Sequence, residues 1–293
     1  MADLTRRSLL TGCAGTAALA LAACGTATTA GDGAPDLETL RLTVDGGFTT
    51  AAIAFRTLPV LTLTADGQVL TPDPVAEIYP GPLLPHLSSR DLDPAGRAAL
   101  ADAVLASGLI TTPPPDFGTP GVADAPTTTL RVTLDGTETM LAANALAEAG
   151  AAPELTAEQQ EARDAFRALV DRLRDLEGAV GAEHLGDPSP YAPDSVWLRA
   201  LPAPTEGVPE DPAPTVLPWP VPEVVLADLD TPTLVGGEAA QSVLSALEGA
   251  TELTWFRDPG ADAGADAGAD PGAGVYLVLA RPALPGDRDD ARS

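Results

Sequence analysis

The chain has 293 residues, 45 % of them hydrophobic, and a formal net charge of −26 at pH 7. It contains no lysine, so all of its 16 basic residues are arginines. A negative field of this size repels phosphate backbones, which argues against nucleic-acid binding. Without lysine, Schiff-base chemistry and a lysine-dependent phosphate loop are excluded as well. Only 4 % of the residues are aromatic, which predicts an aliphatic core.

The first 23 residues have the pattern of a cleavable export signal. Arg6 and Arg7 precede an uncharged, weakly apolar run of 16 residues that ends at Ala23. A membrane-spanning helix needs about 20 strongly apolar residues, so this run is short for a permanent anchor. The paired arginines resemble the twin-arginine leader of bacteria. We therefore predict a signal peptide over 1–23 and export by the twin-arginine route.

The segment Leu21-Ala22-Ala23-Cys24 resembles a lipobox, which implies that Cys24 becomes the first mature residue and carries a lipid on its sulfur. The alternatives are a retained anchor helix and an accidental pair of arginines. The lipid at Cys24 is then the predicted contact with the membrane, at the extracytoplasmic face of the plasma membrane. Cys13 leaves with the leader, so the mature chain has no free thiol for catalysis, disulfides or metal binding.

Residues 24–36 are mostly small and polar, a composition that predicts a flexible tether between the lipidated cysteine and the folded part of the chain. An α+β domain is expected over 37–182. A second α+β part is expected over 190–285, joined by a proline-rich connection, and a disordered tail over 286–293. The proline-rich stretch 202–222 is interpreted as a stiff surface connection, an interdomain linker or a segment recognised by a partner.

Alternating apolar and polar residues predict strands over 40–44, 58–64 and 68–71 in the first half of the chain. Asp66-Gly67 between the last two is a strong hairpin signal. Asp93-Pro94 begins a helix that ends at Gly108, since Asp is a good N-cap and Gly a common helix terminator. The stretch 79–86 contains three prolines and is interpreted as a rigid turn.

Asp135-Gly136 predicts a second hairpin between strands at 128–134 and 137–141. Thr156 and Gln159 form a capping box at the start of the longest helix, which we expect to continue to about Leu176. Its apolar stripe includes Phe166, Leu169, Val170 and Leu173. Further strands are expected at 195–201, 251–257 and 275–281, and a helix at 238–248.

Paired strands separated by single helices predict an α+β fold, with antiparallel sheets built from hairpins and packed with a few helices. Two successive hairpin-and-helix units, near 58–108 and 128–176, suggest an internal duplication. The repeat of Gly-Ala-Asp over 260–270 lacks the ligand spacing of a calcium loop and predicts an expanded hairpin tip.

Four segments carry a resemblance to a family: LTADGQV at 63–69, YPGPLLP at 79–85, ADAPTTTL at 123–130 and RPALP at 281–285. They resemble a group of actinobacterial envelope lipoproteins, and the resemblance extends over most of 40–285. It implies a shared fold and location but no activity, because these motifs are turns and strands.

Candidate chemistry is sparse. A zinc site would need both histidines, His86 and His184, together with carboxylates. No G-x-S-x-G motif is present, which argues against a Ser-His-Asp triad. Glu77, Asp116 and Asp124 lie in loops and offer candidate pairs of carboxylates for glycoside hydrolysis. Trp197, Trp219 and Trp255 are expected in the core, with a sugar or peptide groove as the alternative.

No catalytic, cofactor-binding or metal-binding residue is therefore predicted, and no cofactor. The first hypothesis is a lipid-anchored, non-catalytic envelope protein that binds an unidentified protein or small molecule. The alternative is a carboxylate-based hydrolase of cell-wall polysaccharide or peptide. A solute-capture subunit of a transporter is the third hypothesis, which the lack of alternating βα units disfavours.

Overall fold

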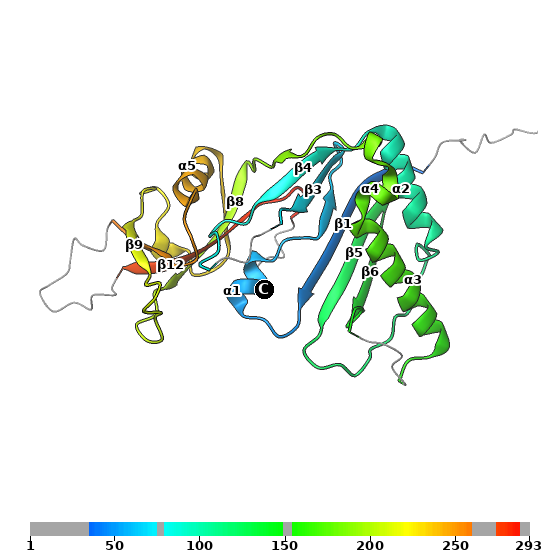
Figure 1. Ribbon diagram of the computed structural model, residues 1–293, viewed down its shortest axis with the longest axis horizontal. Helices are drawn as coiled ribbons and strands as arrows, with labels where there is room; N and C mark the ends of the chain where they lie inside the picture. The colour runs from blue at the N-terminus through cyan, green and yellow to red at the C-terminus, as the bar shows by residue number, and fades with distance from the viewer. Residues whose placement is uncertain (1–34, 75–78, 149–153, 260–273, 288–293) are drawn as a thin grey trace, which may run out of the picture. The chain divides into compact units, whose positions relative to one another are not determined.

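The computed structural model describes residues 35–74, 79–148, 154–259 and 274–287. Within these residues the strands form two sheets, one of seven strands and one of five. The predicted α+β fold is confirmed, since the sheets are mostly antiparallel and are covered by single helices (Figure 1). The described residues of both sheets belong to one compact unit.

The first sheet has the order β6-β5-β1-β2-β3-β4-β7. Strands β4, β5 and β6 alternate buried and accessible residues, as expected of a sheet with one covered face, whereas β2 is buried at all three positions. The strands are β1 (Leu37–Gly46), β2 (Leu61–Leu63), β3 (Gln68–Pro72), β4 (Leu87–Asp91), β5 (Pro126–Leu134), β6 (Thr137–Asn144) and β7 (Ser189–Pro190).

Both Asp-Gly hairpins form as predicted. β2 pairs with β3 across the turn at Asp66-Gly67, and β5 pairs with β6 across Asp135-Gly136. Gly67 and Gly136 have φ values of +92° and +73°, a region that a residue without a Cβ adopts at no steric cost. The two hairpins lie on either side of β1, so the suggested duplication corresponds to two hairpins in one sheet.

Helices α2 (Pro94–Ala106), α3 (Ala157–Arg174) and α4 (Leu176–Val180) cover one face of the first sheet (Figure 1). Asp93 caps α2 as predicted, with its side chain accepting a hydrogen bond from Gly96 N. The capping box of Thr156 and Gln159 is also confirmed. The long helix, however, ends at Arg174 and not at Leu176. Asp175 leaves the helical conformation there and its side chain caps α4 instead.

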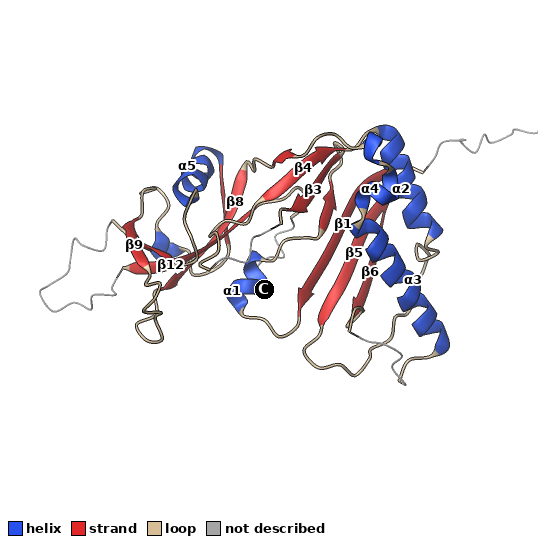
Figure 2. Ribbon diagram, in the orientation of Figure 1, coloured by secondary structure: helices blue, strands red, loops and turns tan. Residues whose placement is uncertain are grey.

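The second sheet has the order β10-β8-β12-β11-β9. Its strands are β8 (Ser195–Pro202), β9 (Thr215–Pro218), β10 (Thr233–Gly236), β11 (Thr254–Arg257) and β12 (Val275–Pro282). Helix α5 (Gly237–Leu247) packs on this sheet (Figure 2). The predicted strands at 195–201 and 275–281 and the helix at 238–248 are confirmed within one or two residues. Two short 3-10 turns complete the chain: η1 (Ala182–His184) lies between α4 and β7, and η2 (Leu226–Asp228) lies between β9 and β10.

The proline-rich stretch 202–222 is not an interdomain linker. Its residues 215–218 form β9, which pairs in parallel with β11. Trp219 follows directly and is buried, with its ring edge against Phe256 at 5.1 Å between centroids. The composition of the stretch resembled a linker, but β9 lies at the sheet edge, where proline removes no hydrogen bond that the sheet needs.

The expectation of a disordered tail from residue 286 is wrong for Asp287. Its carboxylate is 6 % exposed and forms ion pairs with Arg41 on β1 and Arg281 on β12. Short elements were also missed by the sequence patterns: helix α1 (Ala51–Arg56), strand β4 and strand β7. The Gly-Ala-Asp repeat at 260–270 lies outside the described residues.

Candidate functional site

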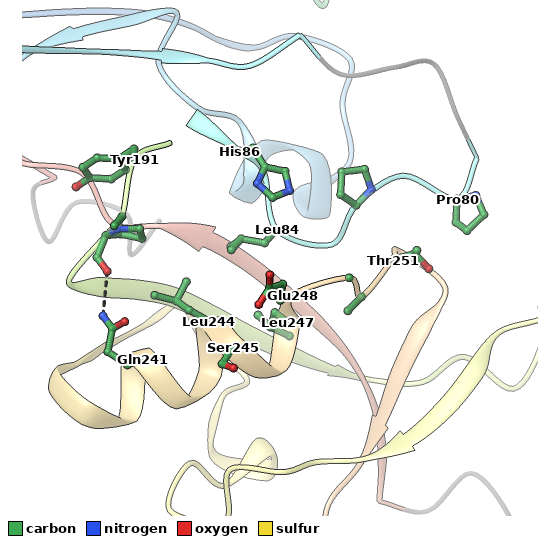
Figure 3. Close-up of a pocket in the computed structure, with 15 residues that line it drawn as sticks. Pro80, Leu84, His86, Tyr191, Gln241, Leu244, Ser245, Leu247, Glu248 and Thr251 are labelled. Atoms are coloured by element: carbon green, nitrogen blue, oxygen red, sulfur yellow. Dashed lines mark hydrogen bonds between the residues drawn. The ribbon is translucent and has the colours of Figure 1, made fainter. Parts of the chain in front are cut away.

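A cavity of about 660 Å³ lies between the proline-rich turn that precedes β4 and the C-terminal half of α5 (Figure 3). Its wall is mainly aliphatic and proline, with a few polar groups. It is lined by Pro80, Pro82, Leu84, His86, Tyr191, Ala192, Pro193, Gln241, Leu244, Ser245, Leu247, Glu248, Gly249, Ala250 and Thr251.

Backbone hydrogen bonds hold the proline-rich turn against the segment after α5. Leu83 N donates to Ala250 O at 2.9 Å, and Glu252 N donates to Gly81 O at 2.9 Å. Arg56 supports the same contact, because its guanidinium donates to Pro82 O at 2.6 Å and pairs with the Glu252 carboxylate at 2.5 Å. The wall formed by the turn is therefore rigid, both from proline and from these bonds.

The opposite wall comes from the segment between β7 and β8. Gln241 Nε2 on α5 donates to Pro193 O at 3.2 Å, the contact drawn in Figure 3. Tyr191 is held by two bonds, from its N–H to Leu87 O and from its hydroxyl to Ala283 O. Burial raises the pKa of Tyr191 above 10.0, and the negative charges of Asp194, Asp287 and Asp66 add to the effect. The phenol is therefore neutral at physiological pH and acts as a hydrogen-bonding group.

The cavity suits a mostly apolar guest. Leu84, Leu244 and Leu247 supply apolar surface on facing sides. His86 and Glu248 are exposed side chains of the wall, so they are available for hydrogen bonds near solvent. Pockets that combine apolar walls with few polar groups are typical of small-molecule sites.

Neither of the two predicted carboxylates that the structure describes, Asp116 and Asp124, lines this cavity. Asp116 accepts hydrogen bonds from Gly118 N and Gln159 Nε2, each at 2.8 Å, and these bonds lower the pKa of its carboxyl. Asp124 is exposed and occupies a turn with a φ of +54°, where its carbonyl accepts from Phe48 N. Glu77 lies outside the described residues, as do Cys24, Arg6 and Arg7. Asp116 thus has a structural role at the start of α3.

The two histidines lie in different settings. His86 lines the cavity, whereas His184 Nδ1 contacts Asp93 Oδ2 at 3.0 Å at the N-terminus of α2. Within the described ranges no three His, Cys, Asp or Glu side chains are grouped to hold a metal ion.

Two of the three tryptophans are core residues, as predicted. Trp197 is 3 % exposed and Trp219 is 2 % exposed, and neither lines the cavity. Trp255 is partly buried on β11. The three side chains therefore do not form the wall of this cavity.

Sequence patterns pointed to a rigid turn at 79–86 but not to its partner on α5. These segments are about 160 residues apart, and no local signal links them. The one indication in the sequence is the density of prolines in the turn, which marks a preformed backbone surface.

No protein-family model, curated protein or solved structure matches the chain. No helix in the described part of the chain is long and apolar enough to cross a membrane.

Proposed function

We propose that this protein is an exported, lipid-anchored binding module of the cell envelope, which holds a small, uncharged and mostly apolar ligand in the cavity beside α5. The observation that carries the proposal is the 660 Å³ cavity with rigid proline walls and facing leucines. Its size falls within the range of pockets for small molecules, about 300–1,000 Å³.

Three features support binding rather than catalysis. Among the described residues of the wall no nucleophile is paired with a base, since neither Ser245 nor Thr251 forms a hydrogen bond with His86. Among the described residues that line the cavity Glu248 is the one carboxylate, whereas a glycosidase needs two. The phenol of Tyr191, which donates to Ala283 O, and the amide of Gln241, which donates to Pro193 O, are polar groups of the wall that carry no charge.

The binding proposal is tested by filling the cavity. Ser245 is exposed on α5 and lines the cavity, while Ser242 is exposed on the same helix and does not. Ser245→Trp should abolish binding of the neutral dye Nile red to the full-length chain, measured by dye fluorescence. Ser242→Trp is the matched control and should bind as the native chain does. Equal binding by both variants, or no binding by the native chain, would refute the proposal.

The anchor is proposed from the sequence of the leader alone. Cys24→Ser should leave an uncleaved precursor and abolish labelling with radioactive palmitate. Arg6→Lys combined with Arg7→Lys should block export, because the twin-arginine route reads the guanidinium pair. Processing and labelling of Cys24→Ser would refute the lipid site, and normal export of the double variant would refute the route.

A further inference from the structure

A second cavity, of about 820 Å³, lies on the face of the second sheet that points away from α5. It is separate from the cavity beside α5 and shares no lining residue with it. Three arginines converge on it in a chain whose net charge is −26. They come from both sheets: Arg41 from β1, Arg199 from β8 and Arg281 from β12.

Strand register places two of these arginines next to each other. β8 and β12 lie side by side, with Leu279 opposite Arg199 and Arg281 opposite Trp197 (Figure 2). Residues two apart on a strand share a face, so Arg199 and Arg281 are diagonal neighbours on one face. The contact of the Arg281 guanidinium with the Trp197 ring, at 5.6 Å from the centroid, agrees with this register.

The three guanidinium groups differ in their partners. Asp287 pairs with both Arg41, at 2.5 Å, and Arg281, at 2.8 Å. Arg199 donates from Nε to the backbone carbonyl of Asp230 at 3.0 Å. In the part of the chain that the structure describes, no carboxylate lies within 4 Å of Arg199 as an ion pair. Its terminal nitrogens are therefore available at the cavity.

The local charge defines the ligand class. Among the lining side chains and their ion-pair partners, Arg41, Arg199 and Arg281 stand against Asp287 and the exposed Asp45, which leaves one positive charge. That charge balances a single anionic group, and a guanidinium fork fits the two oxygens of a carboxylate or phosphodiester. The rest of the wall offers an apolar surface for the body of such a ligand, from Ala54, Phe55, Leu58, Pro59 and Pro232.

We propose that this cavity is a binding site for an amphipathic ligand that carries one negative charge, a carboxylate or a phosphodiester, held by Arg199. Two sources have this chemistry: a free organic acid and the headgroup of an anionic phospholipid. The acidic field of the whole chain opposes anions with higher charge, so selectivity for a single charge follows from the balance of charges around the cavity.

The test is calorimetric titration of the full-length chain with hexanoate, diethyl phosphate, dihexanoyl phosphatidylglycerol and the neutral 1-hexanol. At least one anion should bind with a Kd of about 1 mM or tighter, and 1-hexanol should not bind. Hexanoate binding alone identifies an organic acid as the source. Binding of diethyl phosphate and of the short-chain lipid identifies a headgroup.

Two pairs of variants locate the site. Arg199→Gln should weaken anion binding at least about tenfold, because a charged hydrogen bond is lost. Arg172→Gln, at an exposed arginine of α3, should bind as the native chain does. Ala54 is exposed and lines the cavity, so Ala54→Glu should abolish anion binding while the isosteric Ala54→Gln should retain it.

The second pair keeps the proposal testable if Arg199→Gln does not fold. Failure of every anion to bind, equal binding of 1-hexanol, or equal binding by Ala54→Glu and Ala54→Gln would overturn the proposal.

Discussion

Arg163 is a buried cation whose partners are backbone carbonyls. Its side chain has no solvent exposure, and its guanidinium donates to Phe117 O, Asn144 O and Ala145 O at 2.6–3.2 Å. Burial lowers the pKa of Arg163 below its ordinary value, and the nearby charge of Arg167 lowers it further. Three carbonyl acceptors replace part of the hydration that the cation loses on folding. Arg163 thereby connects α3 to the end of β6.

His184 and Asp93 form a titrating pair at the start of α2. The hydrogen bond from the imidazole to Asp93, followed by the charges of Asp93 and Glu183, raises the pKa of His184 above 6.5 against the opposing effect of burial. Hydrogen bonds from Gly96 N and His184 lower the pKa of Asp93 below 3.8. Both groups are therefore charged together at mildly acidic pH.

The pair predicts a pH-dependent contribution of His184 to stability. A pKa that is raised in the folded state gives a contribution that is complete below the unfolded value near 6.5 and is lost as pH rises through the folded pKa. The melting temperature of the native chain should exceed that of His184→Gln at about pH 5–6. This difference should be largest there and should decrease at higher pH. Melting temperatures measured across this range check the expectation.

Asp93→Asn is the control for that experiment. Asparagine is as good an N-cap as aspartate, so α2 keeps its cap while the charge is removed. In the Asp93→Asn background, the effect of His184→Gln on the melting temperature should depend much less on pH, because only the weaker influences of burial and of Glu183 on the pKa of His184 remain. A margin that does not depend on pH in the native background would contradict the role assigned to the pair.

At the scale of elements, α3 joins the first sheet through one face. Phe166, Leu169, Val170 and Leu173 are buried in the core that the sheet and helices share. The opposite face carries ion pairs, from Arg167 to Asp164 at 2.6 Å and from Arg174 to Asp171 at 4.0 Å. Exposed pairs of this kind contribute little, so burial of the apolar face is what stabilises the helix in the fold.

Phe166 is the central residue of that face. It has no solvent exposure, and its ring lies 5.1 Å from the ring of Phe117 between centroids. Phe166→Ala should lower the free energy of unfolding by about 3–5 kcal/mol, because a cavity replaces the ring. Urea denaturation measures the change. Arg172→Ala, on the exposed side of the same helix, should change stability by less than about 0.5 kcal/mol.

At the scale of the whole molecule, Asp287 connects the two sheets. It pairs with Arg41 of the first sheet and Arg281 of the second, and it accepts hydrogen bonds from Trp197 Nε1 and Leu284 N. Burial alone would raise the pKa of Asp287. The charges of Arg281 and Arg41 and the hydrogen bonds outweigh burial and hold the pKa below 3.8.

Asp287→Asn should therefore destabilise the fold. The amide cannot neutralise two partly buried guanidinium groups, and the loss at pH 7 should be about 2–4 kcal/mol. The loss in free energy of unfolding relative to the native chain should reach its full value above the unfolded pKa near 3.8. It should decrease as pH falls through the folded pKa, because the native carboxylate becomes protonated. Urea denaturation at several pH values measures both effects.

Asp171→Asn provides the comparison. Asp171 is 70 % exposed and lies 4.0 Å from Arg174, so its loss should change stability by less than about 0.5 kcal/mol. A similar small effect for Asp287→Asn would show that the ion pairs of Asp287 do not stabilise the arrangement of β1 and β12.

The amino-acid sequence by itself determined the α+β class, both Asp-Gly hairpins, the caps of α2 and α3 and the apolar face of α3. These features depend on residues within a few positions of each other, through turn geometry, capping hydrogen bonds and periodicity. The order of the strands, the inclusion of β9 in a sheet and the buried position of Arg163 were decided by the tertiary structure.

Both cavities are also features that only the tertiary structure decided. The cavity beside α5 joins a turn near residue 82 to a helix near residue 245, and the arginine cavity joins β1 to β8 and β12. No local sequence pattern predicts such contacts. They form between segments that come together only when the sheets are formed, and the free energy of the whole fold decides which segments meet. The sequence contains 16 arginines in an acidic, lysine-free chain, and only the tertiary structure places three of them around one cavity.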